Sequence, residues 1–166
     1  AIKTWKDVED CYRELVNDKD YETIVIDPLG NFMDFLLKDV GGAEGMSLPK
    51  WGQAITKFKD FVRAWTQAGK NIIFIAHDTW TPDDGSQLRT VQLPGKELPS
   101  VFLNMMDVIG YYQVEANGDR QLLLQPTTKI KAGTRFKCFP PSRYLSKLLS
   151  PPIAKPPSIR PFIYDS

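Results

Sequence analysis

The sequence predicts an α/β fold built on a mainly parallel sheet that is flanked by helices. Two short runs, residues 22–27 and 71–76, are apolar and rich in β-branched and aromatic residues. Continuous runs of this kind predict strands buried on both faces, as in parallel sheets. Helical periodicity surrounds both runs, and Asn117-Gly118 between two further apolar runs predicts an antiparallel hairpin at the sheet edge. We therefore expect an α/β domain with an antiparallel edge.

The composition of this 166-residue chain is that of a globular protein with a sizeable core. Hydrophobic residues make up 42% and charged residues 25%, which are ordinary values. No run approaches the ~20 apolar residues of a membrane span, so we expect no membrane partner. Two cysteines, Cys11 and Cys138, without a C-x-x-C pair and with one histidine, argue against a disulfide framework and a structural zinc site. Reduced thiols favour a cytoplasmic location.

Charge is unevenly distributed along the chain, although the formal net charge is +1. Residues 1–47 contain five Lys/Arg and eleven Asp/Glu, whereas residues 129–164 contain eight Lys/Arg and no acid. The basic region suggests an anionic partner. The alternative is that oppositely charged faces of two subunits meet head to tail.

The first part of the chain predicts a helix, a strand and a second helix. Residues 4–17 have an apolar face, and Thr4 is a suitable N-cap. The buried strand 22–27 follows and is broken by Pro28-Leu29-Gly30. Residues 31–40 then predict a helix that two glycines stop.

The next part predicts a long helix and the second buried strand. Ser47 and Pro49 open a helix that extends to about residue 68, with Gly69 as its natural C-cap. The strand 71–76 comes next. Because crossovers between parallel strands are right-handed, this helix is expected on one face of the sheet.

The second half of the chain predicts irregular structure, a helix and the hairpin. Residues 79–96 contain turn signals and are expected to form a polar excursion. A short helix is expected over about 98–106, and 107–114 pairs with 122–124 across Asn117-Gly118. A basic loop, 127–136, follows the hairpin.

The chain becomes proline-rich from Phe139 onward. Such a segment is expected to be extended and to wrap its own core or a neighbour. We therefore divide the chain into a core of residues 1–138 and a basic tail of residues 139–166.

Two polar residues end the two buried strands. Because ligands bind at the carboxyl edge of parallel sheets, Asp27 and His77 are expected to face one crevice. Asp27 is a candidate Mg²⁺ ligand, usually through a coordinated water, and His77 a candidate phosphate sensor or water-orienting group. The alternatives are a turn-capping aspartate and a neutral structural histidine.

Basic residues of the 127–136 loop are candidates for phosphate contacts. Lys131 and Arg135 could reach a nucleotide, and Lys129, Lys131, Arg135 and Lys137 could bind single-stranded DNA. The alternative is a solvated basic loop. Trp80, in the predicted polar excursion, is the tryptophan that we least expect to be buried.

The order of these features resembles phage-encoded RecA-like ATPases, the P-loop recombination proteins often described as AAA-domain proteins. The similarity covers about residues 4–137. The stretches that resemble the family are T-W-K-D-V-E-D-C-Y-R-E-L, Y-E-T-I-V-I-D-P-L-G, N-I-I-F-I-A-H-D, D-V-I-G-Y-Y and K-I-K-A-G-T-R-F. Each motif is moderately specific, and their order gives most of the weight.

The resemblance implies a RecA-like sheet, ATP and Mg²⁺ as cofactors, single-stranded DNA as partner and a homo-oligomeric ring or filament. Asp27 resembles the Walker B carboxylate, and His77 the polar sensor on the neighbouring strand. Lys131 and Arg135 resemble basic residues that approach a nucleotide held by the adjacent subunit. A phage protein of this kind acts in the cytoplasm of a bacterial host.

One family feature does not occur in this sequence. No phosphate loop of the form G-x-x-x-x-G-K-[ST] is found in the 166 residues. We expect a fragment of an ATP-dependent recombination or annealing protein. The alternatives are a RecA-like assembly or DNA-binding module that has lost ATP hydrolysis and, ranked last, a metal-dependent nuclease using Asp27, His77 and Asp78.

Overall fold

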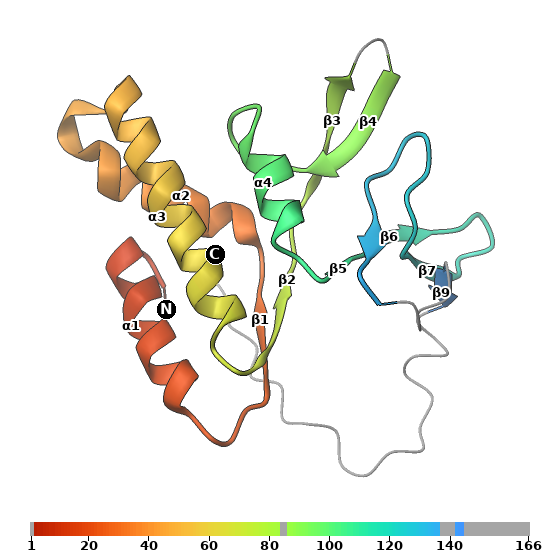
Figure 1. Cartoon of the computed structure of the whole chain (residues 1–166), viewed down its shortest axis with the longest axis horizontal. Coiled ribbons are helices and arrows are strands. Elements are labelled where there is room, and N and C mark those ends of the chain that lie inside the picture. The colour runs from red at the N-terminus through yellow and green to blue at the C-terminus, as the bar shows by residue number, and fades with distance from the viewer. Residues whose placement is uncertain (1, 84–85, 137–141, 145–166) are drawn as a thin grey trace. The chain divides into compact units, whose positions relative to one another are not determined.

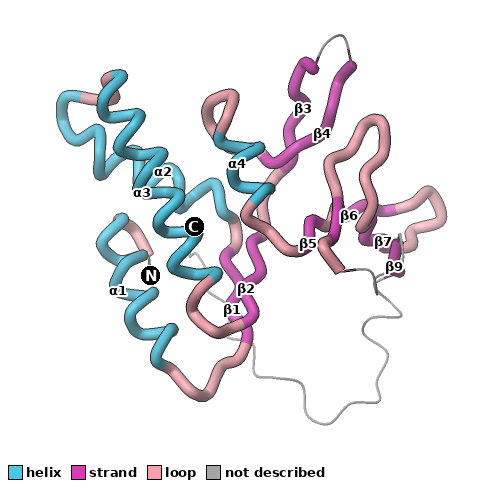
Figure 2. Tube along the Cα trace, viewed as in Figure 1, coloured by secondary structure: helices cyan, strands magenta, loops and turns pink. Residues whose placement is uncertain are grey.

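The computed structural model describes residues 2–83, 86–136 and 142–144 (Figure 1). The chain divides into two compact units, which are described separately. The described part of unit 1 comprises residues 2–77 and 93–98, and that of unit 2 comprises residues 78–83, 86–92, 99–136 and 142–144. Figure 2 shows that the long helices lie in the first 70 residues and that most strands lie in the later part.

Unit 1 begins with α1, Trp5–Asn17, as predicted. Thr4 is its N-cap, and a capping box joins Thr4 to Asp7. The Asp7 backbone N–H donates to the Thr4 hydroxyl at 3.2 Å, and the Thr4 backbone N–H donates to the Asp7 carboxylate at 2.9 Å. These bonds satisfy amide groups that the first helical turn leaves without partners.

The capping box makes part of the folding stability depend on pH. The hydrogen bond from the Lys3 backbone N–H, and then those from Thr4, hold the pKa of Asp7 below its usual value. A lowered pKa stabilises the folded state above about pH 4, and this contribution is lost as pH falls through the folded-state pKa. Urea midpoints of wild type and Asp7→Asn should therefore differ near neutral pH and converge in acid. An equal difference at both pH values would contradict this role, and Asp34→Asn, on the exposed side of α2, serves as the control.

Strand β1, Thr23–Ile26, pairs in parallel with β2, Asn71–Phe74, as predicted. Ile24 lies opposite Ile72, and Ile26 lies opposite Phe74. Figure 1 shows α1, α2 and α3 on the same side of this pair. The strands are therefore the parallel neighbours that their composition indicated.

The expectation that both strands are central is wrong for the described sheet, and burial on both faces is wrong for β2. Ile73 is 48% exposed and Ile75, just beyond the strand, 43%. The sheet has two strands among the described residues, so each has one hydrogen-bonded neighbour there. Alternate side chains of a strand point to opposite faces. Ile24 and Ile26 are buried on one face of the pair, and Ile73 lies on the other face, opposite Val25.

The helical layer of unit 1 is completed by α2, Leu29–Gly41, the short 3₁₀ turn η1, Gly42–Glu44, and α3, Leu48–Thr66. Helix α2 begins two residues before the predicted start, directly after Pro28. Gly42, at a φ of 56°, ends it, because this left-handed conformation favours glycine. Pro49 lies in the first turn of α3, as predicted.

Phe61 on α3 is the centre of the aromatic core of unit 1. Its ring centroid lies 5.2 Å from that of Trp5 on α1 and 6.0 Å from that of Phe32 on α2. Phe58 and Trp65 on α3 also contact it, at 6.3 and 6.2 Å. This one side chain therefore joins all three helices.

Unit 2 contains a hairpin that the sequence analysis missed. Residues 78–91 form β3, Asp78–Asp83, and β4, Ser86–Val91, which pair antiparallel. The predicted polar excursion is therefore wrong over this range. Asp83 pairs with Ser86, so two residues, Asp84-Gly85, connect the strands. Asp-Gly between two runs in which polar and apolar residues alternate is a hairpin signal that could have revealed this pair.

Where the structure describes it, the rest of unit 2 consists of one helix and five short strands. Helix α4 spans Leu98–Asn104, close to its predicted range. The strands are β5 (Val108–Ile109), β6 (Tyr111–Val114), β7 (Arg120–Leu123), β8 (Gly133–Thr134) and β9 (Ser142–Tyr144).

The predicted hairpin is confirmed, since β6 pairs antiparallel with β7 across Asn117-Gly118. The predicted strand 107–114 is divided at Gly110, where a Cβ atom would lie 2.7 Å from Leu122 Cδ1. The proline-rich tail lies outside the described residues except for β9, which pairs with β7. The boundary at residue 138 also lies outside them and stays a prediction.

The α/β class is confirmed, but a mainly parallel sheet is not. Among the named strands of the described chain, parallel pairing is confined to β1–β2, and the other four pairings are antiparallel. The predicted edge hairpin belongs to a separate three-stranded sheet, β6–β7–β9. Within the described residues, every helix is too short or too polar to cross a membrane.

Candidate functional site

The parallel pair β1–β2 places Asp27 and His77 beyond the same end of its two strands. Asp27 directly follows β1, and His77 follows β2 by three residues. Past the strands, the Ile75 N–H donates to the Ile26 carbonyl at 2.9 Å and the Leu29 N–H to the Ile75 carbonyl at 2.7 Å. Asp27 and His77 are both exposed. A cleft shared by their side chains stays a prediction.

The Asp27 carboxylate is suited to binding a cation together with a phosphate. In the described part of the chain, neither a hydrogen bond nor an ion pair engages it. No group of three or more His, Cys, Asp or Glu residues that could hold a metal occurs among the described residues. Mg²⁺ is commonly held by one or two carboxylates, with phosphates and water as the other ligands. A Mg²⁺ site at Asp27 therefore stays a prediction, in which nucleotide phosphates and water would supply the other ligands.

The predicted phosphate-binding residues of unit 2 differ in their surroundings. Arg135 donates from Nη2 to the Asn104 carbonyl at 2.6 Å and from Nη1 to Asp107 Oδ1 at 3.2 Å. Asn104 is the last residue of α4, so Arg135 caps the C-terminal end of this helix. A structural role therefore competes with the predicted nucleotide contact.

Lys129 and Lys131 lie on an extended segment beside β4. The Arg89 N–H donates to the Lys129 carbonyl at 2.7 Å, and the Lys131 N–H donates to the Arg89 carbonyl at 3.1 Å. Lys131 Nζ also approaches Ser100 Oγ at 3.4 Å. Lys129 is exposed, and within the described residues its ammonium group takes part in no hydrogen bond or ion pair, which leaves it available to an anion. Lys137 lies outside the described residues.

The β-bridge between β4 and residues 129–131 places Arg89 on one face of the paired segments and the two lysines on the other. Arg89 pairs with Ile130, so these two residues share one face of the paired segments. Lys129 and Lys131 flank Ile130 and therefore occupy the other face. Lys129 and Lys131 therefore share one face, and Arg89 lies on the other.

A cluster that sequence reasoning missed lies on the Arg89 face. Arg89 Nη1 donates to Asp78 Oδ2 at 2.6 Å and to the Tyr111 hydroxyl at 2.8 Å. The guanidinium carbon of Arg89 lies 4.4 Å from the centre of the Trp80 ring. These residues come from β3, β4 and β6, so they are far apart in sequence and no local motif marks them.

The register of β3 and β4 explains why Trp80 and Arg89 stack. Trp80 lies directly opposite Arg89. The backbone groups of Arg89 are used by Lys129 and Lys131, so the Trp80–Arg89 pair is of the non-hydrogen-bonded type. Side chains approach more closely in such pairs. The hydrogen bond to Asp78 raises the pKa of Arg89, which stays charged and fixed beside the ring.

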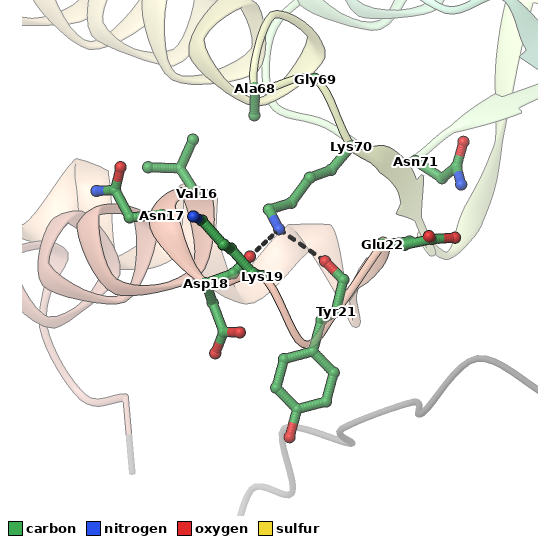
Figure 3. Close-up of a pocket in the computed structure, with 10 residues that line it drawn as sticks. All are labelled: Val16, Asn17, Asp18, Lys19, Tyr21, Glu22, Ala68, Gly69, Lys70 and Asn71. Carbon is green, nitrogen blue, oxygen red and sulfur yellow. Dashed lines mark hydrogen bonds between the residues drawn. The ribbon is translucent and has the colours of Figure 1, made fainter.

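A separate hollow lies at the opposite end of β1 and β2 from Asp27 (Figure 3). It has a volume of about 660 Å³, is open to solvent and is lined mainly by polar residues that include Lys19, Glu22 and Lys70. Lys70 Nζ donates to the Asp18 carbonyl and, at 2.6 Å, to the Tyr21 carbonyl. Lys70 therefore links the α1–β1 connection to the start of β2 through two hydrogen bonds, which already use its amine.

The comparison with protein families shows which family the chain belongs to. The model of the family described as AAA domain matches residues 1–136. The chain belongs to the AAA domain family. Neither the curated proteins nor the solved structures gave a match.

Membership in the AAA domain family gives the strand-end residues a chemical context. AAA-type domains are nucleotide-binding, ATPase-like domains that generally bind ATP with Mg²⁺. The match spans both the β1–β2 pair and the basic segment beside β4. The exposed Asp27 carboxylate at the end of β1 is an oxygen ligand of the kind that Mg²⁺ prefers, so it is consistent with binding of ATP with Mg²⁺.

Proposed function

We propose that this AAA domain belongs to an ATP-dependent protein that binds single-stranded DNA in recombination or annealing, as in the phage proteins that its sequence resembles. The proposal includes a homo-oligomeric ring or filament that acts in the cytoplasm of a bacterial host. The observation that supports it best is the exposed Lys129 on an extended segment fixed against β4. Single-strand binding proteins combine such positive charge with aromatic side chains.

Each strand-end residue has a role in this proposal. Asp27 would hold Mg²⁺, which would supply positive charge to offset that of the nucleotide phosphates. His77, which lies beyond the same end of β2, would contact the terminal phosphate or orient water. Arg135 and Lys131 would approach a nucleotide held by the adjacent subunit, which for Arg135 requires exchange of its contacts with α4.

The second candidate is an assembly or DNA-binding module that does not hydrolyse ATP. The sequence feature that favours it is the absence of a phosphate-loop motif from these 166 residues. Without backbone amides to cradle the β- and γ-phosphates, hydrolysis would not survive. The two candidates share the DNA surface and differ only in ATP turnover.

Replacing Lys129 and Lys131 with alanine should weaken binding to single-stranded DNA and flatten its salt dependence. Each lost phosphate contact reduces the log–log slope by about 0.7, so two contacts reduce it by about 1.4. The affinity for a labelled oligonucleotide is measured by fluorescence anisotropy over a range of salt concentrations.

The matched control is Lys38→Ala with Lys59→Ala, which removes the same charge from α2 and α3 of unit 1. Its slope should equal that of wild type. If the Lys129/Lys131 variant keeps its affinity and slope while the oligomer dissociates, the segment is a subunit contact and the DNA assignment is wrong.

A further inference from the structure

We propose that Trp80 is a stacking platform for a base of single-stranded DNA and that the proposed DNA surface extends over the Trp80 face of β3 and β4. This inference rests on the proposed function and names how the strand would be recognised. The ring is 44% exposed, whereas Trp5 and Trp65 are 5% and 2% exposed. Exposure alone says little, because single exposed apolar side chains are common on protein surfaces.

The fixed orientation of the ring distinguishes Trp80 from an ordinary exposed side chain. Arg89 lies over the ring at 4.4 Å and is held there by Asp78 and by the Tyr111 hydroxyl. Tyr111 also donates to Asp78 at 3.4 Å, which closes the network. A ring that is already ordered loses little conformational freedom when a ligand stacks on it, so binding costs less.

The donors of Arg89 add a polar contact beside the ring. Its hydrogen bonds to Asp78 and Tyr111 both use Nη1. In the described chain, Nη2 and Nε of this guanidinium have no recorded protein acceptor. These N–H groups can therefore donate to a base edge or a phosphate next to a stacked base.

Charge favours nucleic acid as the occupant of this surface. Asp78 balances the charge of Arg89. The surplus positive charge near this surface therefore comes from Lys129 and Lys131, on the segment that pairs with β4. Strands are spaced by about 4.8 Å, which places β3 and the 129–131 segment on the order of 10 Å apart. Lys129 lies on the opposite face from Trp80, but its segment is the outer one beside β4 among the described residues. Its long, flexible stem can bring the ammonium around this edge to a phosphate while a nearby base reaches Trp80.

The test is a titration of the full chain with a short oligothymidylate, followed by tryptophan fluorescence and by anisotropy. Stacking on Trp80 should quench its emission. Trp80→Ala should bind about tenfold more weakly, with an unchanged salt slope because no phosphate contact is lost. Trp80→Phe should keep most of the affinity and lose the quenching, while the control Trp51→Phe, on α3, keeps both.

The outcomes separate this inference from the proposed function. If Trp80→Ala binds like wild type while the Lys129/Lys131 variant binds weakly, the platform is wrong and the function stands. If wild type binds no single-stranded DNA, both are wrong. If Trp80→Ala changes only self-association, the ring is a contact between copies and the inference fails. If circular dichroism shows that Trp80→Ala is unfolded, Trp80→Phe tests the inference instead. Retained affinity with lost quenching supports the platform, and retained quenching contradicts it.

Discussion

Replacing Phe61 with alanine is expected to lower the free energy of unfolding of unit 1 by about 3–5 kcal/mol. The ring is 9% exposed and contacts aromatic side chains of α1, α2 and α3. Truncation removes apolar surface and leaves a cavity at the point where the three helices meet. Neighbouring rings are too rigid to fill such a space completely.

Urea unfolding followed by tryptophan fluorescence measures this effect, because Trp5 and Trp65 are buried in the same cluster. Gln53→Ala, on the exposed side of α3, is the control and should change stability by less than about 0.5 kcal/mol. A loss below about 1 kcal/mol for Phe61→Ala would mean that the aromatic cluster does not organise unit 1.

Replacing Asp27 with asparagine is expected to lower Mg²⁺-dependent ATP hydrolysis about 100-fold, which corresponds to about 2.7 kcal/mol of transition-state stabilisation. An amide is nearly isosteric with a carboxylate but has no negative charge to hold the metal. The carboxylate is exposed, and no recorded bond of the described chain engages it, so the substitution should leave the fold intact. Hydrolysis is measured as the release of inorganic phosphate in the presence of Mg²⁺.

The control is Asp34→Asn, which makes the same chemical change at an exposed position of α2. Asp34→Asn should hydrolyse ATP like wild type. If Asp27→Asn is equally active, Asp27 is a turn residue and the Mg²⁺ assignment is wrong. If wild type binds ATP and does not hydrolyse it, the module without turnover is the correct candidate.

Local signals in the sequence determined much of unit 1. Helix α1 and its Thr4 cap were predicted because a capping residue acts on amides only a few positions away. Pro49 marks the start of α3 because its fixed φ suits the first helical turn. Gly42 marks the end of α2 because glycine adopts a positive φ readily. The parallel neighbours β1 and β2 also followed from their composition.

The sequence likewise indicated where the candidate site residues lie but not what surrounds them. That Asp27 and His77 follow the same ends of two paired strands was predictable, because parallel strands place their carboxyl ends together. The sequence also determined the AAA-type resemblance, which the family match over residues 1–136 supports.

Only the tertiary structure decided how the basic residues are used. Arg135 caps α4, about thirty residues earlier in the chain, and Lys129 and Lys131 lie on the opposite face from Arg89. The exposure of Ile73 on β2 depends on whether another layer covers its face of the sheet, which its own apolar run does not specify. The Asp78, Trp80, Arg89 and Tyr111 cluster likewise depends on the register of β3 and β4 and on the position of β6. Pairings between distant segments leave no periodic signal in either segment, so the fold alone brings these four side chains together.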